Sequence, residues 1–123
     1  DWLDENHREA TLGFLDHHDL TYVCVDEPQG YRSSVPPITA VTNPALSYVR
    51  FHGRRQEMWE KEGATVPERF KYLYNEGELK EWVPKLEGLA EQAAQVHVLL
   101  NNNYEDYAVR NARQLRLFLG QTD

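Results

Sequence analysis

Cysteine is nearly absent from this chain, and its scarcity excludes disulfide-stapled folds. Cys24 is the single cysteine among 123 residues, so no internal disulfide can form. It lies in the middle of an apolar stretch, where a thiol acts as a small core side chain rather than as a nucleophile. A chain without disulfides is typical of a reducing compartment, and we therefore expect a cytoplasmic protein.

Long apolar runs and net positive charge are missing as well. No apolar stretch approaches the ~20 residues that span a bilayer, so we expect no membrane partner. The chain has 13 Lys and Arg against 20 Asp and Glu, a formal net charge of -7. This balance disfavours non-specific binding to nucleic acid, because such binding depends on cations that neutralise phosphates. With 41% hydrophobic and 27% charged residues, the composition is that of a globular domain.

The apolar pattern predicts helices that alternate with strands. Strands are expected at 20–25, 48–54 and 96–100, helices at 4–18, 76–94 and 103–119, and short helical turns at 56–62 and 67–74. A further short strand is predicted at 38–42, within a connection rich in proline. Because the strand at 20–25 is an apolar run rich in β-branched residues, we expect it to be buried on both faces. Strands alternating with helices predict an α/β fold with a parallel sheet.

Several residues predict where the helices end or bend. Asp4 is the expected N-cap of the first helix, and Asp19 is expected to end it in a left-handed conformation. Pro84 predicts either a kink in the long helix or its division into two. Asn103 is the expected N-cap of the last helix.

Polar side chains follow each predicted strand where the strand ends. The carboxyl ends of parallel strands form the ligand-binding face of β/α proteins, so these side chains outline one candidate site. Its members are Asp26 and Glu27 after the first strand, Arg50 and His52 at the end of the second, and Asn101 and Asn102 after the third.

Arg50 and His52 are the central pair of this candidate site. Residues two apart in a strand point to the same face, so we expect the two side chains to emerge together. Arg50 either binds an anionic or oxygen-rich ligand or forms a structural ion pair with Asp26 or Glu27. His52 is a candidate general base, and Asp26 a candidate catalytic partner. Glu27 is adjacent to Asp26, so at most one of the two points inward.

Metal binding is only weakly indicated, because Asp26, Glu27 and His52 lack a diagnostic ligand spacing. Asn101 and Asn102, with the hydroxyl of Tyr104, suggest a phosphate site at the start of the last helix. The alternative is that Asn103 caps this helix and its neighbours only stabilise the loop.

Aromatic side chains gather in the polar stretch 56–74. Trp59 and the tyrosines at 72 and 74 either line a ligand cleft or pack against one another, and their near-helical spacing favours packing. No serine stands at a sharp, glycine-flanked turn between a strand and a helix, so a serine nucleophile is not indicated.

Seven short motifs occur in an order that resembles the C-terminal half of the YecE-like family, also called domain of unknown function 72. They are YVCVDEPQG, VPP, AVT, YVRFHGR, RFKYLY, ELKEW and NNNYEDYAVRNARQL. The resemblance implies a variant TIM-like β/α barrel of about twice this length, of which residues 1–123 are the C-terminal part. The chain opens on Asp1 rather than Met, which agrees with a missing N-terminal part. The family has no assigned activity.

Two hypotheses about function follow. In the first, the protein is an enzyme whose site holds an anionic or polyhydroxylated small substrate with five residues, which are Asp26, Arg50, His52, Asn101 and Asn102. In the second, the barrel binds phosphate or nucleic acid without chemistry. Neither the residues nor the resemblance indicates a cofactor. Half a barrel leaves open strand edges, so the expected partner is the missing N-terminal half or a second copy of the chain.

Overall fold

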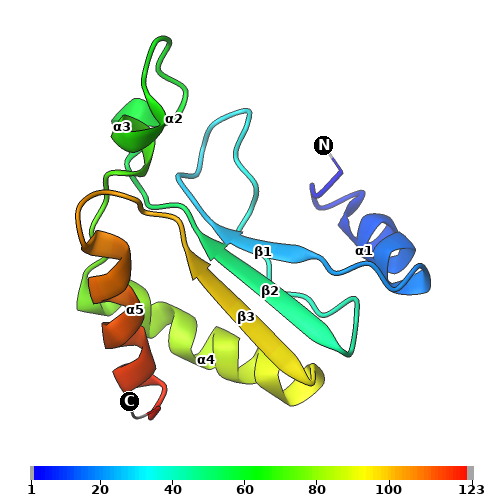
Figure 1. Ribbon diagram of the computed structural model, residues 1–123. Coiled ribbons are helices and arrows are strands. Elements are labelled where there is room, and N and C mark those ends of the chain that lie inside the picture. Colours follow the sequence, from blue (N-terminus) through cyan, green and yellow to red (C-terminus); the bar gives the residue numbers. More distant parts are fainter. Residues whose placement is uncertain (1, 122–123) are drawn as a thin grey trace.

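The computed structural model describes residues 2–121, so Asp1 and residues 122–123 lie outside the described part. Three parallel strands form one sheet with the order β1-β2-β3 (Figure 1). Their bounds are Val23–Asp26 for β1, Leu46–Phe51 for β2 and Gln95–Leu100 for β3. The predicted α/β class and parallel sheet are confirmed.

Within the described residues, five helices accompany the sheet. They are α1 (Arg8–His17), α2 (Gln56–Trp59), α3 (Val66–Phe70), α4 (Glu76–Gln92) and α5 (Tyr107–Phe118). α4 and α5 contact each other and β3, while α2 and α3 stand beyond the carboxyl ends of the strands (Figure 1). α4 and α5 therefore lie on one side of the sheet, and the short helices α2 and α3 lie next to its carboxyl edge.

The core lies between the sheet and α4. Alternate residues of β2 are buried, and of these Val49 and Phe51 have no exposed surface. Leu79 and Trp82 of α4 are likewise fully buried. The rings of Phe51 and Trp82 pack edge to face, with their centroids 5.0 Å apart. Burial of each such side chain stabilises the fold by roughly 1.5–3 kcal/mol. This packing fixes the sheet, and with it the polar residues at its carboxyl edge.

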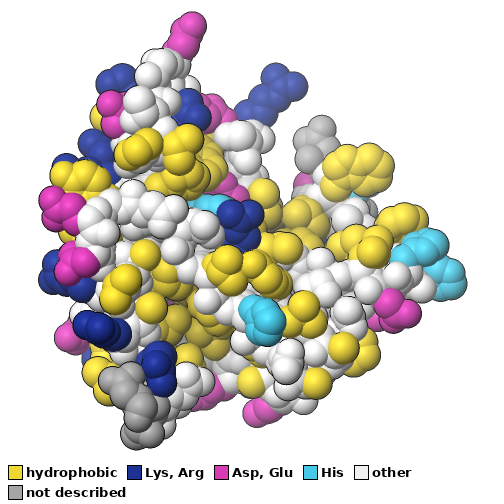
Figure 2. Space-filling model, viewed as in Figure 1, with side chains coloured by type: hydrophobic (Ala, Val, Ile, Leu, Met, Phe, Trp, Pro, Cys, Tyr) yellow, Lys and Arg dark blue, Asp and Glu magenta, His cyan; other side chains and the backbone are white. Residues whose placement is uncertain are grey.

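The opposite face of the sheet remains open. The register places Val25, Arg50 and Leu99 side by side across the three strands on this face. Val23 is 37% exposed and Leu99 38%, whereas Val25, near the carboxyl end of β1, is only 8% exposed. Figure 2 looks onto this side, where hydrophobic side chains lie uncovered over the strands. Within residues 2–121, no helix packs against this face.

Two strand predictions were wrong. β1 begins at Val23 rather than at Leu20, and Val23 is exposed, although the consecutive residues Cys24, Val25 and Asp26 are buried and thus bury both faces at the end of the strand. The segment 38–42 is not a strand, although it runs alongside β1. The hydroxyl of Thr42 accepts the N–H of Tyr22 at 2.8 Å, and the thiol of Cys24 lies 3.8 Å from a backbone oxygen of this segment. Side-chain bonds thus replace the backbone ladder that a strand requires.

The helix boundaries show both agreement and differences. Asp19 has φ 54, which confirms the left-handed end of the first helix. That helix begins at Arg8 rather than next to Asp4, because the Asp4 carboxylate accepts N–H groups within a preceding turn. α4 continues through Pro84 as one helix rather than two.

Asn103 does not cap the last helix, so that prediction was wrong. Its N–H instead donates to the carbonyl of Asn101 at 2.8 Å, within a turn that follows β3. Glu105 then adopts a left-handed conformation, with φ 47, which redirects the chain. α5 therefore begins at Tyr107, with Asp106 as its N-cap residue.

Candidate functional site

Asp26 ends β1 and points toward α4, away from the open face of the sheet. Its two oxygens accept from the hydroxyl of Tyr74 at 2.7 Å and the indole N–H of Trp82 at 2.8 Å. They also accept from two guanidinium nitrogens of Arg54, at 3.0 and 2.8 Å. A carboxylate offers about four acceptor positions, so these donors leave none for a substrate.

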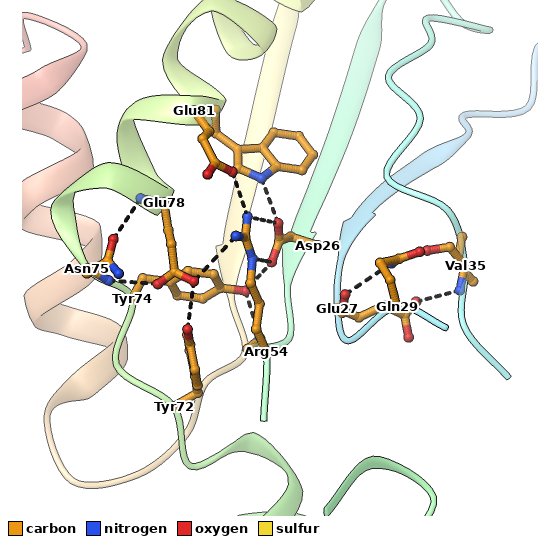
Figure 3. A network of polar contacts seen from close by, with 12 residues as sticks. Asp26, Glu27, Gln29, Val35, Arg54, Tyr72, Tyr74, Asn75, Glu78 and Glu81 are labelled. Atoms are coloured by element: carbon orange, nitrogen blue, oxygen red, sulfur yellow. Dashed lines mark hydrogen bonds and ion pairs between the residues drawn. The ribbon is translucent and has the colours of Figure 1, made fainter. Parts of the chain in front are cut away.

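Arg54 connects Asp26 to two further carboxylates on α4 (Figure 3). Its guanidinium lies 3.3 Å from Glu78 and 3.1 Å from Glu81. Hydrogen bonding to Asp26 raises the pKa of Arg54, and the nearby acidic charges add to this effect. Glu78 also accepts from the hydroxyl of Tyr72 at 2.6 Å and completes a capping box at the start of α4. This cluster fixes the N-terminal turn of α4 to the end of β1.

Tyr74 joins the same cluster to the residue that follows β2. Its hydroxyl accepts the backbone N–H of Gly53 at 2.8 Å while donating to Asp26. Burial, followed by the charge of Asp26, raises the pKa of Tyr74, so the phenol stays protonated. Asp26 is therefore the centre of a structural network rather than a neighbour of Arg50.

Arg50 lies on the open face, and its partner comes from the end of β3. The guanidinium Nε donates to the amide oxygen of Asn101 at 3.1 Å. The ion pairs among residues 2–121 do not include Arg50, so the predicted alternative of a structural pair with Asp26 or Glu27 is not formed. Arg54, rather than Arg50, forms the ion pair with Asp26. A cation held by a neutral amide keeps its charge available to an external anion.

His52 follows Arg50 at the end of β2 and lies among aromatic rings. Its imidazole is 5.5 Å from the ring of Phe70 and 6.3 Å from that of Trp59. Desolvation lowers the pKa of His52, and the positive charge of Arg50 lowers it further. The ring is therefore neutral at neutral pH, which is the form that accepts a proton as a general base.

Glu27 points away from Asp26, toward the loop that follows β1 (Figure 3). The side chain is almost fully buried, with 7% exposed, and its carboxylate accepts the N–H of Val35 at 3.3 Å. Burial raises the pKa of Glu27 to about 7. Within residues 2–121, the carboxylate of Glu27 is hydrogen-bonded to this loop and not to Arg50 or His52.

Asn102 and Tyr104 are not brought to Arg50. Asn102 is fully buried, and its amide donates to the carbonyl of Tyr72 at 2.8 Å and to Asn111 at 2.9 Å. Tyr104 lies beside Lys71, whose ammonium stands 4.2 Å from the ring centroid. Of the residues predicted for the site, the structure thus groups Arg50 with Asn101 and His52.

The sequence reasoning missed the partners of Asp26. Arg54 stands just past the strand that adjoins Asp26, which is the one local signal that could have indicated the pair. Tyr74 and Trp82 lie 48 and 56 residues away along the chain, so only the fold brings them in. Within residues 2–121, no group of three or more His, Cys, Asp or Glu side chains could hold a metal ion. No helix in that range has both the length and the apolar character to cross a membrane.

Parallel strands with helices against one face and polar side chains at the carboxyl ends define this chain as part of a TIM-like β/α barrel. The chain belongs to the family described as protein of unknown function DUF72, which matches residues 1–123.

Three relatives illustrate this membership. The UPF0759 protein YunF of Bacillus subtilis is 36% identical over 117 residues, which cover 93% of this chain and 42% of YunF. A DUF72 family crystal structure from Enterococcus faecalis V583 has a TM-score of 0.91 at 32% identity, covering 99% of this chain and 45% of that one. Another, from Thermotoga maritima MSB8, has a TM-score of 0.82 at 37% identity, covering 93% and 42%. The chain thus spans less than half the length of these relatives.

Proposed function

We propose that Arg50, His52 and Asn101 bind an anionic or polyhydroxylated small molecule at the carboxyl ends of the strands. The observation that carries this proposal is the position of Arg50 on the open face of the sheet. Its one hydrogen-bond acceptor within residues 2–121 is the neutral amide of Asn101, at 3.1 Å. A guanidinium in this setting is suited to phosphate or carboxylate, which it binds with two parallel hydrogen bonds.

His52 decides whether binding is followed by chemistry. In the catalytic version of the proposal, its neutral imidazole removes a proton from the bound molecule. In the non-catalytic version, the same residues hold a phosphate and His52 supplies only a hydrogen bond. Asp26 has a different role in both versions, because its oxygens are already occupied by Arg54, Tyr74 and Trp82.

We also propose that the open face is covered by further β/α units of the same barrel. The span of this chain, 42–45% of its relatives, supports this proposal, as do the exposed side chains of Val23 and Leu99. Native mass spectrometry of the chain tests it. We expect a complex with a second polypeptide, or copies of the chain itself, and a stable monomer without exposed apolar surface would contradict it.

Calorimetric titration of inorganic phosphate into the assembled barrel, that is this chain together with the remaining units, tests the binding site. Arg50→Met is expected to weaken binding by about tenfold or more, because a charge-assisted bond contributes roughly 1.5–3 kcal/mol. Arg110→Met, at an exposed position on α5, is the control and should leave binding unchanged. Equal affinities in Arg50→Met and the unaltered protein would refute the proposal.

A second variant separates the two versions of the proposal once a turnover assay exists. His52→Ala should abolish turnover but retain phosphate binding if the imidazole is the general base. Retained turnover in His52→Ala would show that the imidazole is not the general base.

A further inference from the structure

β3 forms one edge of the described sheet, and it pairs with β2 along one side only (Figure 1). The N–H of Asn101, just after β3, donates to the carbonyl of Phe51 on β2 at 2.7 Å. Backbone groups of successive strand residues point to opposite edges, so every second residue back from Asn101 also faces β2. The N–H and C=O groups of Val96, Val98 and Leu100 therefore point away from β2. Within residues 2–121, these groups have no hydrogen-bond partner.

The side chains of the same three residues point toward the helices, where they are only partly buried. The register places Val98 beside Val49 and Leu100 beside Phe51, and both of these β2 residues are fully buried. β2 has a neighbouring strand on each side, whereas β3 has one. The incomplete burial of β3 on this face thus agrees with the lack of a second neighbour.

A groove of about 270 Å³ lies between β3 and the second half of α5. Two polar residues at the C-terminal end of α5 complete a lining that is otherwise apolar. The apolar part consists of Val96, Val98, Leu100, Ala112, Leu115 and Leu119. The three β3 residues in this lining are the ones whose backbone groups are unpaired. A strand hydrogen-bonded to these groups would therefore place alternate side chains in the groove, against α5.

α4 indicates what α5 is built to cover. Trp82 of α4 packs against Phe51 of β2, and the same helix also contacts β3. A helix in a parallel sheet covers two neighbouring strands in this way. By the same geometry, α5 covers β3 and a strand that lies next to it.

We infer that the unpaired edge of β3 and the groove beside α5 form a docking site for one strand. This strand runs parallel to β3, carries apolar side chains at alternate positions, and belongs to a further β/α unit of the barrel. The chain spans 42–45% of the length of its relatives, and the rest of that length supplies such units. The inference goes beyond the anion site, and it identifies the edge at which the proposed covering units pair with this chain.

A second copy of the chain fits the docking site less well. The other edge strand of the described sheet is β1, which has four residues against six in β3. Its helix-facing side chains are already covered within their own chain. Cys24 is fully buried beside the segment 38–42, and both oxygens of Asp26 accept hydrogen bonds. The β1 strand of another copy therefore has no side chain left to fill the groove.

Amide hydrogen exchange of the assembled barrel, measured by NMR, tests the inference. We expect the amides of Val96, Val98 and Leu100 to exchange within about tenfold of the rate of Asn101, which is bonded to β2. If these three amides exchange more than about a hundredfold faster than Asn101, the edge of β3 is unpaired and the inference is overturned.

Ala112→Glu tests the groove separately from the edge, because it places a charge in the groove and alters no backbone group of β3. It should speed exchange of the three edge amides by about tenfold or more and leave that of Asn101 unchanged. Leu117→Glu is the control, since Leu117 lies on α5 but is 71% exposed and outside the groove. Equal exchange of the edge amides in both variants would refute the role of the groove. If Ala112→Glu fails to fold, the exchange rates of the unaltered barrel decide.

Native mass spectrometry of the same sample separates this inference from the proposals above. Protected edge amides in an assembly that contains only copies of this chain would show that β3 pairs with another copy, and the inferred occupant would be wrong. Unprotected edge amides in an assembly that contains the further units would refute the docking site and leave the covering of the open face intact. Phosphate binding by Arg50 is measured independently of both results.

Discussion

Arg54 and Asp26 form a partly buried ion pair in which two guanidinium nitrogens lie 3.0 and 2.8 Å from the two carboxylate oxygens. The side chain of Asp26 is 5% exposed and that of Arg54 27%. Loss of the Asp26 charge removes the main counter-ion of Arg54 and weakens the acceptor for the buried donors of Tyr74 and Trp82, which is destabilising. The pair belongs to the cluster that fixes the start of α4 to the end of β1, so its contribution is to the stability of the fold.

Asp26→Asn is therefore expected to lower the free energy of unfolding by about 3 kcal/mol, because it keeps the shape of the side chain but leaves Arg54 without its main counter-ion. Urea denaturation measures the change. Glu81→Gln is the matched control, since Glu81 also pairs with Arg54 but is 58% exposed, and its loss should cost less than about 1 kcal/mol. Equal stability of the two variants would contradict the assignment of Asp26 as the centre of the network.

Gly53 is expected to resist replacement by alanine. Its φ is 92, and a Cβ at this position would lie 2.8 Å from Cβ of Tyr72. The left-handed conformation and the steric contact together predict a loss of ~2 kcal/mol or more for Gly53→Ala in thermal or urea denaturation. Gly88→Ala in α4 meets no atom within 4 Å and should instead stabilise the protein, by roughly 0.5–1 kcal/mol. Similar effects in both variants would refute the role assigned to Gly53.

Glu27 is expected to make stability depend on pH. Its pKa in the folded chain, about 7, lies above the ordinary value of 4.5. Between these values the folded chain keeps a proton that the unfolded chain has released, so the free energy of unfolding falls as the pH rises. Glu27→Gln lacks this ionisation, and its stability relative to the unaltered protein should increase from pH 4.5 to about 7.

Melting temperatures of both proteins between pH 4.5 and 8 measure this difference. Glu91→Gln, at an exposed position of α4, is the control and should show no such trend. A difference between Glu27→Gln and the unaltered protein that stays constant with pH, or shrinks as the pH rises, would contradict the assignment.

The imidazole of His52 should respond to the removal of its cationic neighbour. Desolvation and the charge of Arg50 both lower the pKa of His52 from its ordinary value of 6.5. Arg50→Met removes the second cause, so the pKa of His52 should rise. A proton NMR titration of the imidazole signals measures this shift, with Arg110→Met as the control. If the pKa of His52 were unchanged or lower in Arg50→Met, the charge of Arg50 would not be a cause of the lowered pKa of His52.

Much of the fold could be predicted because the sequence carries strong local patterns. The apolar stripe from Leu79 to Leu89 predicts the long helix, and the observed α4 begins at the expected residue. The short strand before Gly53 is predicted by its own apolar residues. The start of α5 could not be predicted, because Glu105 adopts a left-handed conformation that is uncommon for its residue type.

The site could be predicted only in part. Alternation along a strand correctly indicated that Asp26 and Glu27 point to opposite sides, but it could not decide which of them faces inward. That choice depends on Tyr74 and Trp82, whose contacts with Asp26 exist only after the chain has folded. Asn101 and Asn102 illustrate the same limit, since one contacts Arg50 and its neighbour is buried against Asn111.

The most direct test of the proposed anion site follows the Nε–H signals of the arginines by NMR during a titration of the assembled barrel with inorganic phosphate. We predict that the signal of Arg50 shifts, together with the side-chain amide of Asn101, while the signal of Arg54 stays fixed by its bond to Asp26. A shift of Arg54 or of the arginines on α5, with Arg50 unchanged, would contradict the account.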